Sequence, residues 1–504
     1  MSPSFQGKRV LIFQQRGWGM RVGHFLAKKL QTEGAALAAV VFKNSALRFH
    51  TRQTEVKYQF LISHDQIMEN PKAYLGNDRY TLAEICDDLG IDSIWPYVQS
   101  LRHHVRSYAD KYYYGYKQQE TDEEIIDYVM ACYKLVKWVF AQFKPDVILL
   151  PNMVTILHIF FDIYGKKHGV LTLRPIESRI RGVGILTSGF NIDSGRFFER
   201  FFELQGGAQS ANFEKAKKYF AESTKRLITP LHSDQKHRTL IKKIREHLSP
   251  WRQAINYYFT EDPNRSRRFP VMVDSRSPKY ILRDYFTHMK NLRFTKNYPY
   301  ANLSKIDKYL YFALQFEPEE TIDVMAPRFN NQLETLRQVA MSAPGDYTVV
   351  AKDHPLMIGR RSPSYLEKIA RTPNVKLVSP WTPSEEVMRR ADLVVSIAGT
   401  TAAEAAFLRV PAIQLGNFGI TKLFPNVFPH NDFTTLSVKM KEALGTDLNT
   451  PEYDQTLINY IAAAYDVGSD ADYVGLWIGK TTEKMEDLWR LYKTELEYVF
   501  AQKN

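Results

Sequence analysis

The chain has 504 residues, of which 44% are hydrophobic, so it is long enough to form two or three separate cores. Its two cysteines, Cys86 and Cys132, are too few for a disulfide framework or a structural zinc site. The formal net charge of +12 favours an anionic partner. Because there is no signal-peptide pattern and no run of about 18 apolar residues, we expect a cytoplasmic protein without a membrane span.

The first part of the chain has the pattern of an α/β domain. Apolar runs bounded by turn residues predict buried strands at residues 7–15, 35–43, 144–152 and 169–175. The intervening segments predict helices, and a glycine-rich loop that starts at Gly17 is expected to open the first of them. We therefore predict an N-terminal Rossmann-like domain over residues 1–204.

The middle of the chain is strongly basic. Residues 205–300 contain 20 Lys and Arg but only 8 Asp and Glu, and several prolines interrupt them. We predict a helical insertion and linker over 205–304. The excess charge indicates an anionic membrane surface, an acidic polymer or nucleic acid as a partner, and a solvated helical surface is the plain alternative.

Alternating strands and helices return after residue 305. Continuous apolar runs predict strands around 308–316, 346–352, 374–379, 391–397 and 410–415, each followed by a helical segment or a loop. Such runs are typical of a parallel sheet covered on both faces. We therefore predict a second Rossmann-like domain over 305–445, and C-terminal helices over 446–504 that cross back to the first domain.

Polar residues follow three of these predicted strands. One strand ends at Gln315, a second at Lys352 and His354, and a third leads through Ser396 into a turn and a helix. Since parallel strands end at one edge of a sheet, these groups are expected to share a cleft. The turn and helix start offer backbone N–H groups to a phosphate, while His354 and Lys352 stabilise its charge and Glu404 holds a ribose. The predicted donor-binding residues are Gln315, Lys352, His354, Ser396, Gly399, Thr400, Thr401 and Glu404.

These three motifs, in this order, resemble the bacterial capsule polysaccharide biosynthesis family, which includes Kdo transferases, and are similar to GT-B glycosyltransferases in general. The resemblance covers residues 308–418. It implies two Rossmann-like domains facing a cleft, a nucleotide-sugar donor on the C-terminal domain, an acceptor on the N-terminal domain and no obligatory metal or cofactor. By position, it also implies that the donor contacts are Gln315, His354, Ser396, Thr400, Thr401 and Glu404.

The first domain offers candidates for the acceptor side. The basic loop after the first strand contributes Arg16, Arg21 and His24, and His24 is a candidate general base. In the resembled family an acidic pair and an arginine follow a comparable strand, where this chain has Glu177 and Arg179. Glu177 is therefore a candidate catalytic base or nucleophile, and Asn152 a candidate acceptor contact. The alternatives are a first-turn histidine, an Arg–Glu pair that shapes a loop, and an ordinary turn asparagine.

We therefore predict a metal-independent GT-B glycosyltransferase that moves a sugar from a CMP- or UDP-linked donor to a cell-surface polysaccharide or lipid-linked acceptor. Residues 205–300 would bring it to an anionic membrane as a peripheral protein. The alternatives are a teichoic-acid-type polyol-phosphate transferase, a sugar-nucleotide 2-epimerase and, outside enzymes, a basic nucleic-acid-binding protein. The last would leave the polar strand ends unused, so nucleic acid is not the expected partner.

Overall fold

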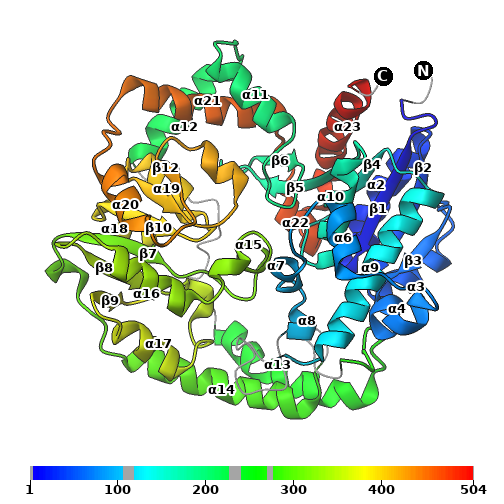
Figure 1. The fold of residues 1–504 in the computed structure, drawn as a ribbon, viewed down its shortest axis with the longest axis horizontal. Coiled ribbons are helices and arrows are strands. Elements are labelled where there is room, and N and C mark those ends of the chain that lie inside the picture. The colour runs from blue at the N-terminus through cyan, green and yellow to red at the C-terminus, as the bar shows by residue number, and fades with distance from the viewer. Residues whose placement is uncertain (1–3, 106–117, 226–239, 270–275, 503–504) are drawn as a thin grey trace.

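The computed structural model describes residues 4–105, 118–225, 240–269 and 276–502. Two six-stranded sheets dominate it, one in each half of the molecule (Figure 1). Counted from its own first strand, each sheet has the strand order 3-2-1-4-5-6, the order of doubly wound nucleotide-binding folds. The predicted class, two Rossmann-like domains in a GT-B-like arrangement, is confirmed.

The first sheet is parallel except at one edge, where β6 runs antiparallel to β5. Its strands are β1 (Arg9–Gln15), β2 (Ala36–Phe42), β3 (Leu61–Ser63), β4 (Val147–Leu149), β5 (Leu171–Glu177) and β6 (Gly184–Thr187). Its helices are α1 (Arg16–Trp18), η1 (Gly19–Gly23), α2 (His24–Thr32), α3 (Asn44–Arg52), α4 (His64–Glu69), α5 (Pro71–Leu75), α6 (Leu82–Leu89), α7 (Trp95–Val98), α8 (Arg102–Val105), α9 (Asp122–Gln142) and α10 (Ile156–Lys167). The continuous apolar strands are buried on both faces, as parallel pairing requires.

The glycine-rich segment after β1 is helical from Arg16 onward, so the expected open loop is absent from this part of the structure. A Cβ at Gly19 would lie 2.6 Å from the backbone carbon of Gln14, and one at Gly23 would overlap the side chain of Gln14. These glycines therefore let the helix pack tightly on the end of β1 and do not form a phosphate cradle.

The second sheet is parallel throughout. Its strands are β7 (Tyr309–Ala313), β8 (Thr348–Lys352), β9 (Val375–Val378), β10 (Leu393–Ser396), β11 (Ala412–Gln414) and β12 (Val427–Pro429). Its helices are η2 (Leu303–Lys305), α15 (Glu320–Asp323), η3 (Pro327–Phe329), α16 (Gln332–Ser342), η4 (Pro355–Met357), α17 (Pro363–Ala370), α18 (Ser384–Arg389), α19 (Thr401–Phe407), η5 (Gly419–Leu423) and α20 (Leu436–Leu444). All five residues of β7 are buried, which places this strand at the centre of the second core.

The remaining helices connect the domains. They are α11 (Arg196–Gln205), α12 (Phe213–Lys225), α13 (Leu240–Phe259), α14 (Pro278–Asn297), α21 (Pro451–Val467), α22 (Tyr473–Ile478), η6 (Thr482–Lys484) and α23 (Met485–Ala501). Helices α11 and α12 pack with α21 on the second core, so the predicted domain boundary at residue 204 falls inside that packing unit. Helices α22 and α23 pack on the first core, and α13 and α14 run beneath both domains (Figure 1).

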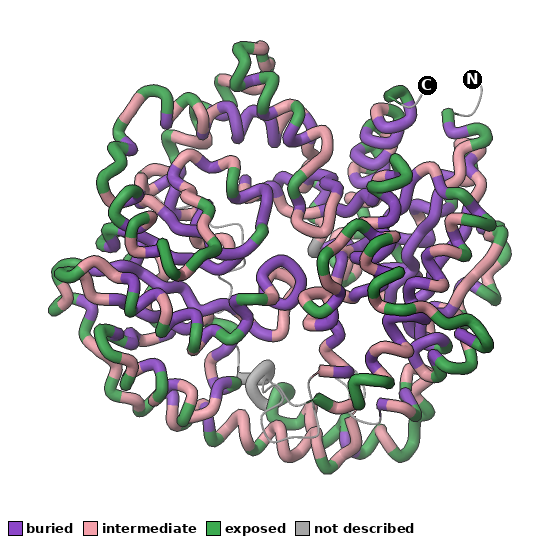
Figure 2. Tube along the Cα trace, viewed as in Figure 1, coloured by how far each residue is buried: buried purple, intermediate pink, exposed green. Residues whose placement is uncertain are grey.

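The basic middle segment is therefore not one separate insertion. Its α12 belongs to the second core, whereas Phe269 is buried in the first and Arg268 pairs with Glu120 there. The sheets are largely buried, while α13 and α14 are mostly exposed or half-buried (Figure 2). Within the described residues, no helix is long and apolar enough to cross a bilayer.

Candidate functional site between the two sheets

A cavity of about 510 Å³ lies at the carboxyl ends of the second sheet's strands. In this strand order the connections diverge between β7 and β10, and ligands bind at such switch points. Residues after β7, β8 and β10 line one side of the cavity, and residues of the β4–α10 loop, β5 and α22 line the other. Its volume falls within the ordinary range of small-molecule sites, about 300–1,000 Å³.

The end of β7 is held by a buried ionic network. The Arg361 side chain is 3% exposed; its Nε donates to Asp353 Oδ1 over 2.9 Å, and its Nη2 donates to the Gln315 carbonyl over 2.9 Å. Its Nη1 lies 3.6 Å from Glu317 Oε1. Arg361 thus ties the segment after β7 to the segment after β8 and fixes two walls of the cavity.

At the end of β8, Lys352 and His354 both line the cavity. Lys352 is 2% exposed and donates to Ser384 Oγ over 3.1 Å, but the described residues give its ammonium no ion pair. Burial lowers the pKa of Lys352 to about 8. A buried cation without a paired carboxylate destabilises the folded protein, but it is suited to binding an anionic ligand.

His354 is held in a defined orientation. The Leu356 N–H donates to His354 Nδ1 over 3.2 Å, and burial lowers the pKa of the imidazole to about 4. The ring is therefore neutral at pH 7, and its single proton is on Nε2. That N–H is available as a hydrogen-bond donor toward the cavity.

The turn after β10 has a different construction from the predicted one. Ser396 is fully buried, and its Oγ accepts the Gly399 N–H over 3.2 Å, so it shapes the turn. Thr400 and Thr401 line the cavity, and the Thr400 hydroxyl donates to Glu404 Oε1 over 2.9 Å. Glu404 lies behind Thr400 and orients it; direct contact of Glu404 with a ribose stays a prediction.

The position of the Gln315 side chain explains why residue 399 is a glycine. A Cβ at Gly399 would overlap Gln315 Oε1 and lie 2.8 Å from its Nε2, so the Gln315 amide packs directly on the glycine. Gln315 also lines the cavity. The motifs after β7 and β10 are thus in contact with each other, as their position at one sheet edge predicts.

The first domain contributes Asn152, Glu177 and Arg179 to the same cavity. Arg179 has a left-handed backbone (φ 70°), and its guanidinium lies over the Phe418 ring at 4.6 Å. Its Nε is buried without a hydrogen-bond partner, and burial lowers the pKa of the guanidinium. Asn152 Oδ1 is likewise buried without a partner. Arg179 was predicted to contact an acceptor, yet it reaches the second domain, where Glu404 also interacts with it electrostatically.

Ser396 and Glu404 do not line this cavity, and three predicted residues of the first domain also lie outside it. His24 Nε2 is 2.8 Å from Glu55 Oε2. The imidazole of the candidate base is therefore bonded to a surface carboxylate. Arg21 Nη2 donates to the Trp477 carbonyl over 2.6 Å and acts as an anchor for α22. Arg16 lines a second, smaller cavity in the first domain. The structure therefore separates His24 and Arg21 from the cleft.

Several cavity residues were missed from the sequence. Glu319 lines the cavity, accepts from the Thr321 hydroxyl over 2.6 Å, and has its pKa raised by burial. Tyr473 and Trp477 of α22 also line it, and the Tyr473 hydroxyl donates to the Pro151 carbonyl over 2.8 Å. Glu319 follows a motif that was recognised, so its position in the chain was a usable signal. No local pattern marks Tyr473 or Trp477.

Two ion pairs join the domains beside the cavity. Arg102 Nε lies 2.9 Å from Asp323 Oδ2, and the fully buried Arg174 pairs with Glu320. At this junction, between the two sheets in Figure 1, α7 of the first domain contacts η3 of the second. The cleft therefore has a fixed floor formed by both domains.

No protein-family model matches the chain, and no curated protein matches it in sequence. Among solved structures, it is similar to UDP-GlcNAc 2-epimerase from Methanocaldococcus jannaschii, with 12% identity and a TM-score of 0.22 over 88% of this chain and 94% of that chain. It is similar to KpsC, a β-Kdo 2,7 transferase of Thermosulfurimonas dismutans, with 11% identity and a TM-score of 0.33 over 69% and 88%. It is also similar to MnaA of S. aureus in a structure with UDP, with 11% identity and a TM-score of 0.26 over 94% and 98%. A Kdo transferase, the kind of protein that the motifs resemble, is thus among the similar structures.

Proposed function

We propose that this protein is a glycosyltransferase that uses a nucleotide-activated sugar. The observation that supports it most strongly is a pair of cations, the buried Lys352 and the half-buried Arg179, that line one cavity at a sheet switch point. Neither cation forms an ion pair among the described residues, so a bound diphosphate or phosphate diester would supply the missing charge.

The reaction breaks the bond between the anomeric carbon and the donor phosphate oxygen, and a new bond forms to an acceptor oxygen. Lys352, Arg179 and the His354 Nε2–H would stabilise the negative charge that develops on the departing phosphate. The acceptor hydroxyl must lose a proton, and Glu177 and Glu319 are two of the cavity carboxylates that can accept it. Because burial raises the pKa of Glu319, its carboxylate is a stronger base than an exposed one.

Glu177 and Glu319 are also compatible with a sugar-nucleotide 2-epimerase, which is the second candidate function. An epimerase requires proton-transferring groups around one sugar and no acceptor. The two activities differ in a simple measurement: an epimerase incubated with its sugar nucleotide alone in deuterated water exchanges the sugar C2 proton. A transferase consumes the donor only when an acceptor or water is the second substrate.

We expect one class of nucleotide to raise the melting temperature of the protein and the others to leave it unchanged, because a ligand that binds only the native state stabilises it. The panel is CMP, CDP, UDP, UDP-GlcNAc, CDP-glycerol and an oligonucleotide. His354→Asn keeps an acceptor for the Leu356 N–H but removes the Nε2 donor, so it should lose most of the response. His354→Gln, which carries an amide N–H farther out, should retain part of it.

Equal responses of His354→Asn and wild type would contradict the donor role of His354. A response to the oligonucleotide alone would favour the nucleic-acid-binding alternative. A response to CDP-glycerol above all others would favour a polyol-phosphate transferase over a sugar transferase.

We also propose that α13 binds an anionic membrane surface. Its exposed apolar side chains recur three or four residues apart and so lie on one face: Leu248, Trp251, Ile255, Tyr258 and Phe259. Arg245 and Arg252 are exposed on the same helix, and Trp251 packs edge-on against exposed Phe286 of α14 at 6.3 Å. Basic residues beside an aromatic stripe are typical of helices that lie in a lipid interface.

Trp251→Ser is expected to weaken binding to vesicles that contain phosphatidylglycerol by roughly tenfold, because one large apolar side chain contributes about 1.5–3 kcal/mol on burial. Trp381→Ser is the matched control, since Trp381 is 47% exposed and Trp251 45% exposed. Sedimentation with vesicles gives the affinities. Equal losses in both variants, or equal binding to uncharged vesicles, would contradict the proposal.

A further inference from the structure

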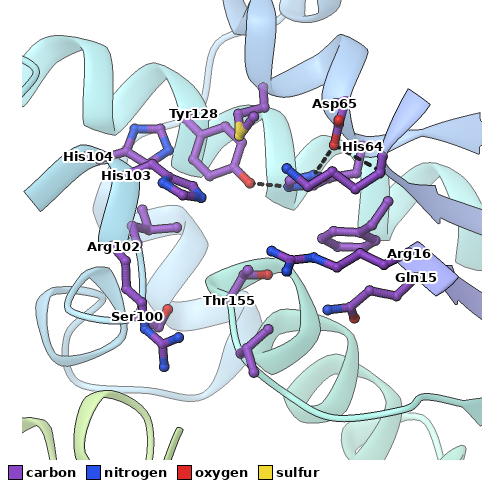
Figure 3. A pocket seen from close by; sticks show the side chains of 15 residues that line it. Gln15, Arg16, His64, Asp65, Ser100, Arg102, His103, His104, Tyr128 and Thr155 are labelled. Atoms are coloured by element: carbon purple, nitrogen blue, oxygen red, sulfur yellow. Dashed lines mark hydrogen bonds and ion pairs between the residues drawn. The ribbon is translucent and has the colours of Figure 1, made fainter. Parts of the chain in front are cut away.

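The first domain has a second cavity, of about 100 Å³, at its own switch point (Figure 3). It lies where β1, β2 and β3 end, and the β4–α10 loop and the segment around α8 close it. The β4–α10 loop also borders the cleft: Asn152 lines the cleft, and Val154 and Thr155 line the second cavity. The two cavities are therefore neighbours on opposite sides of one short loop.

Three cations and one carboxylate line this second cavity: Arg16, Lys43, Arg102 and Asp65. The carboxylate of Asp65 accepts the backbone N–H of Lys43 over 3.2 Å and lies 3.6 Å from His64 Nδ1. The Arg16 side chain extends across the cavity toward Thr155 (Figure 3). Even with Asp323, which pairs with Arg102 from the second domain, the fixed charge around the cavity is positive, which favours an anion.

Two of the histidines that line the cavity, His64 and His104, do not alter this balance. His64 and His104 are fully buried, and burial lowers the pKa of both, so they are neutral at pH 7. His64 Nε2 is bonded to the Tyr128 hydroxyl at 2.5 Å, and its ring stacks on Phe42 at 4.0 Å. These groups form a rigid neutral wall behind the cations.

Arg102 has an unused donor at this cavity. Its Nε is bonded to Asp323 of the second domain, but its Nη2 is buried without a partner. Gln15 Oε1 is a buried acceptor without a partner on the same lining. Buried polar atoms without a hydrogen-bond partner are rare in native interiors and indicate a ligand or bound water.

We propose that this cavity binds a small oxyanion, the carboxylate or phosphate of an acidic acceptor. A cavity of about 100 Å³ has room for a charged substituent such as a carboxylate or a phosphate. The identification of the anion as part of the acceptor rests on the proposed transferase function, whereas the anion site does not. The acceptor would then be an acidic glycan or a phosphate-bearing one, and its reacting hydroxyl would lie in the cleft.

The test compares two charged compounds with their uncharged counterparts, glucuronate with glucose and glycerol 3-phosphate with glycerol. Saturation-transfer NMR on the full chain measures the four affinities. We expect each charged compound to bind at least roughly tenfold more tightly than its counterpart, as hydrogen bonds to charged groups require. The tighter of the two charged compounds identifies carboxylate or phosphate as the preferred group.

Variants assign the binding to this cavity. Arg16→Gln and Arg102→Gln should each weaken the charged compound by roughly tenfold. Arg48→Gln, an exposed arginine on α3, and Asp323→Asn, which removes the partner of Arg102 but keeps the guanidinium, should not. Retained binding in both Arg16→Gln and Arg102→Gln, or equal binding of charged and uncharged compounds, would overturn the inference.

The cleft also attracts anions, and Lys352→Met separates the two sites. If Lys352→Met weakens glucuronate and glycerol 3-phosphate while Arg16→Gln does not, the anions bind only in the cleft, which overturns this inference and leaves the proposed function intact. If Arg16→Gln weakens them and no nucleotide in the panel stabilises any form of the protein, the anion cavity stands and the proposed function fails.

Discussion

Lys352→Met is expected to abolish nucleotide-induced stabilisation while leaving the free protein as stable as wild type or more stable. Methionine has nearly the length and volume of lysine but no charge, so the packing of a side chain that is only 2% exposed is kept. A charge-assisted hydrogen bond to phosphate contributes about 1.5–3 kcal/mol, so affinity should fall roughly 10- to 100-fold.

The stability of the free variant distinguishes a binding residue from a structural one. The pKa of Lys352 falls from 10.5 to about 8, and this shift corresponds to about 3 kcal/mol of unfavourable energy for the charged form in the folded state. A structural lysine would destabilise the protein when replaced. Lys352 should do the opposite, because its replacement removes an uncompensated buried charge.

The pH dependence of nucleotide affinity is a second test of the role of Lys352. The lysine attracts phosphate only when protonated, so nucleotide affinity in the wild type should decrease as pH rises through about 8. A bound phosphate raises the pKa of the ammonium, so the complex retains its proton to higher pH than the free protein. The affinity of Lys352→Met should stay flat over this range. Parallel curves for the two proteins, by calorimetric titration from pH 6.5 to 9.5, would contradict the role of Lys352.

Local sequence predicted much of the second domain's half of the cleft, because each of its motifs consists of a strand and the residues directly after it. Gln315, Lys352 and His354 directly follow apolar runs, and parallel pairing brings such ends to one edge. The local sequence does not show why residue 399 is a glycine. Its lack of a side chain accommodates the Gln315 amide, which is 84 residues away in the chain, so the turn alone could not reveal it.

The other half of the site depends on long-range packing. His24 was expected to lie in a loop after the first strand, yet the glycines before it continue the helix, and His24 faces Glu55. Trp477 reaches the cleft only because α22 returns to the first sheet, where Arg21 bonds to its carbonyl. Helix α11 likewise leaves the first domain because its apolar face meets α21, some 250 residues further along the chain. No periodicity in one segment specifies such partners.

Arg361→Met is expected to destabilise the second domain by about 3–5 kcal/mol, the range for removing one partner of a buried ionic network. Asp353 and Glu317 would lose the guanidinium while remaining 4% and 6% exposed. The Gln315 carbonyl would lose a 2.9 Å hydrogen bond. A loss of this size lowers the melting temperature of a domain by roughly 6–20 °C, which calorimetry can measure.

Arg371→Met is the control, because the Arg371 side chain is 80% exposed and lies 4.0 Å from Glu367, an arrangement that contributes about 0–1 kcal/mol. Arg361→Lys should lie between the two, since a lysine keeps the charge but cannot reach Asp353, Glu317 and the Gln315 carbonyl together. If Arg361→Met melts within about 1 °C of Arg371→Met, the network does not hold the ends of β7 and β8, and the geometry of the phosphate site must have another support.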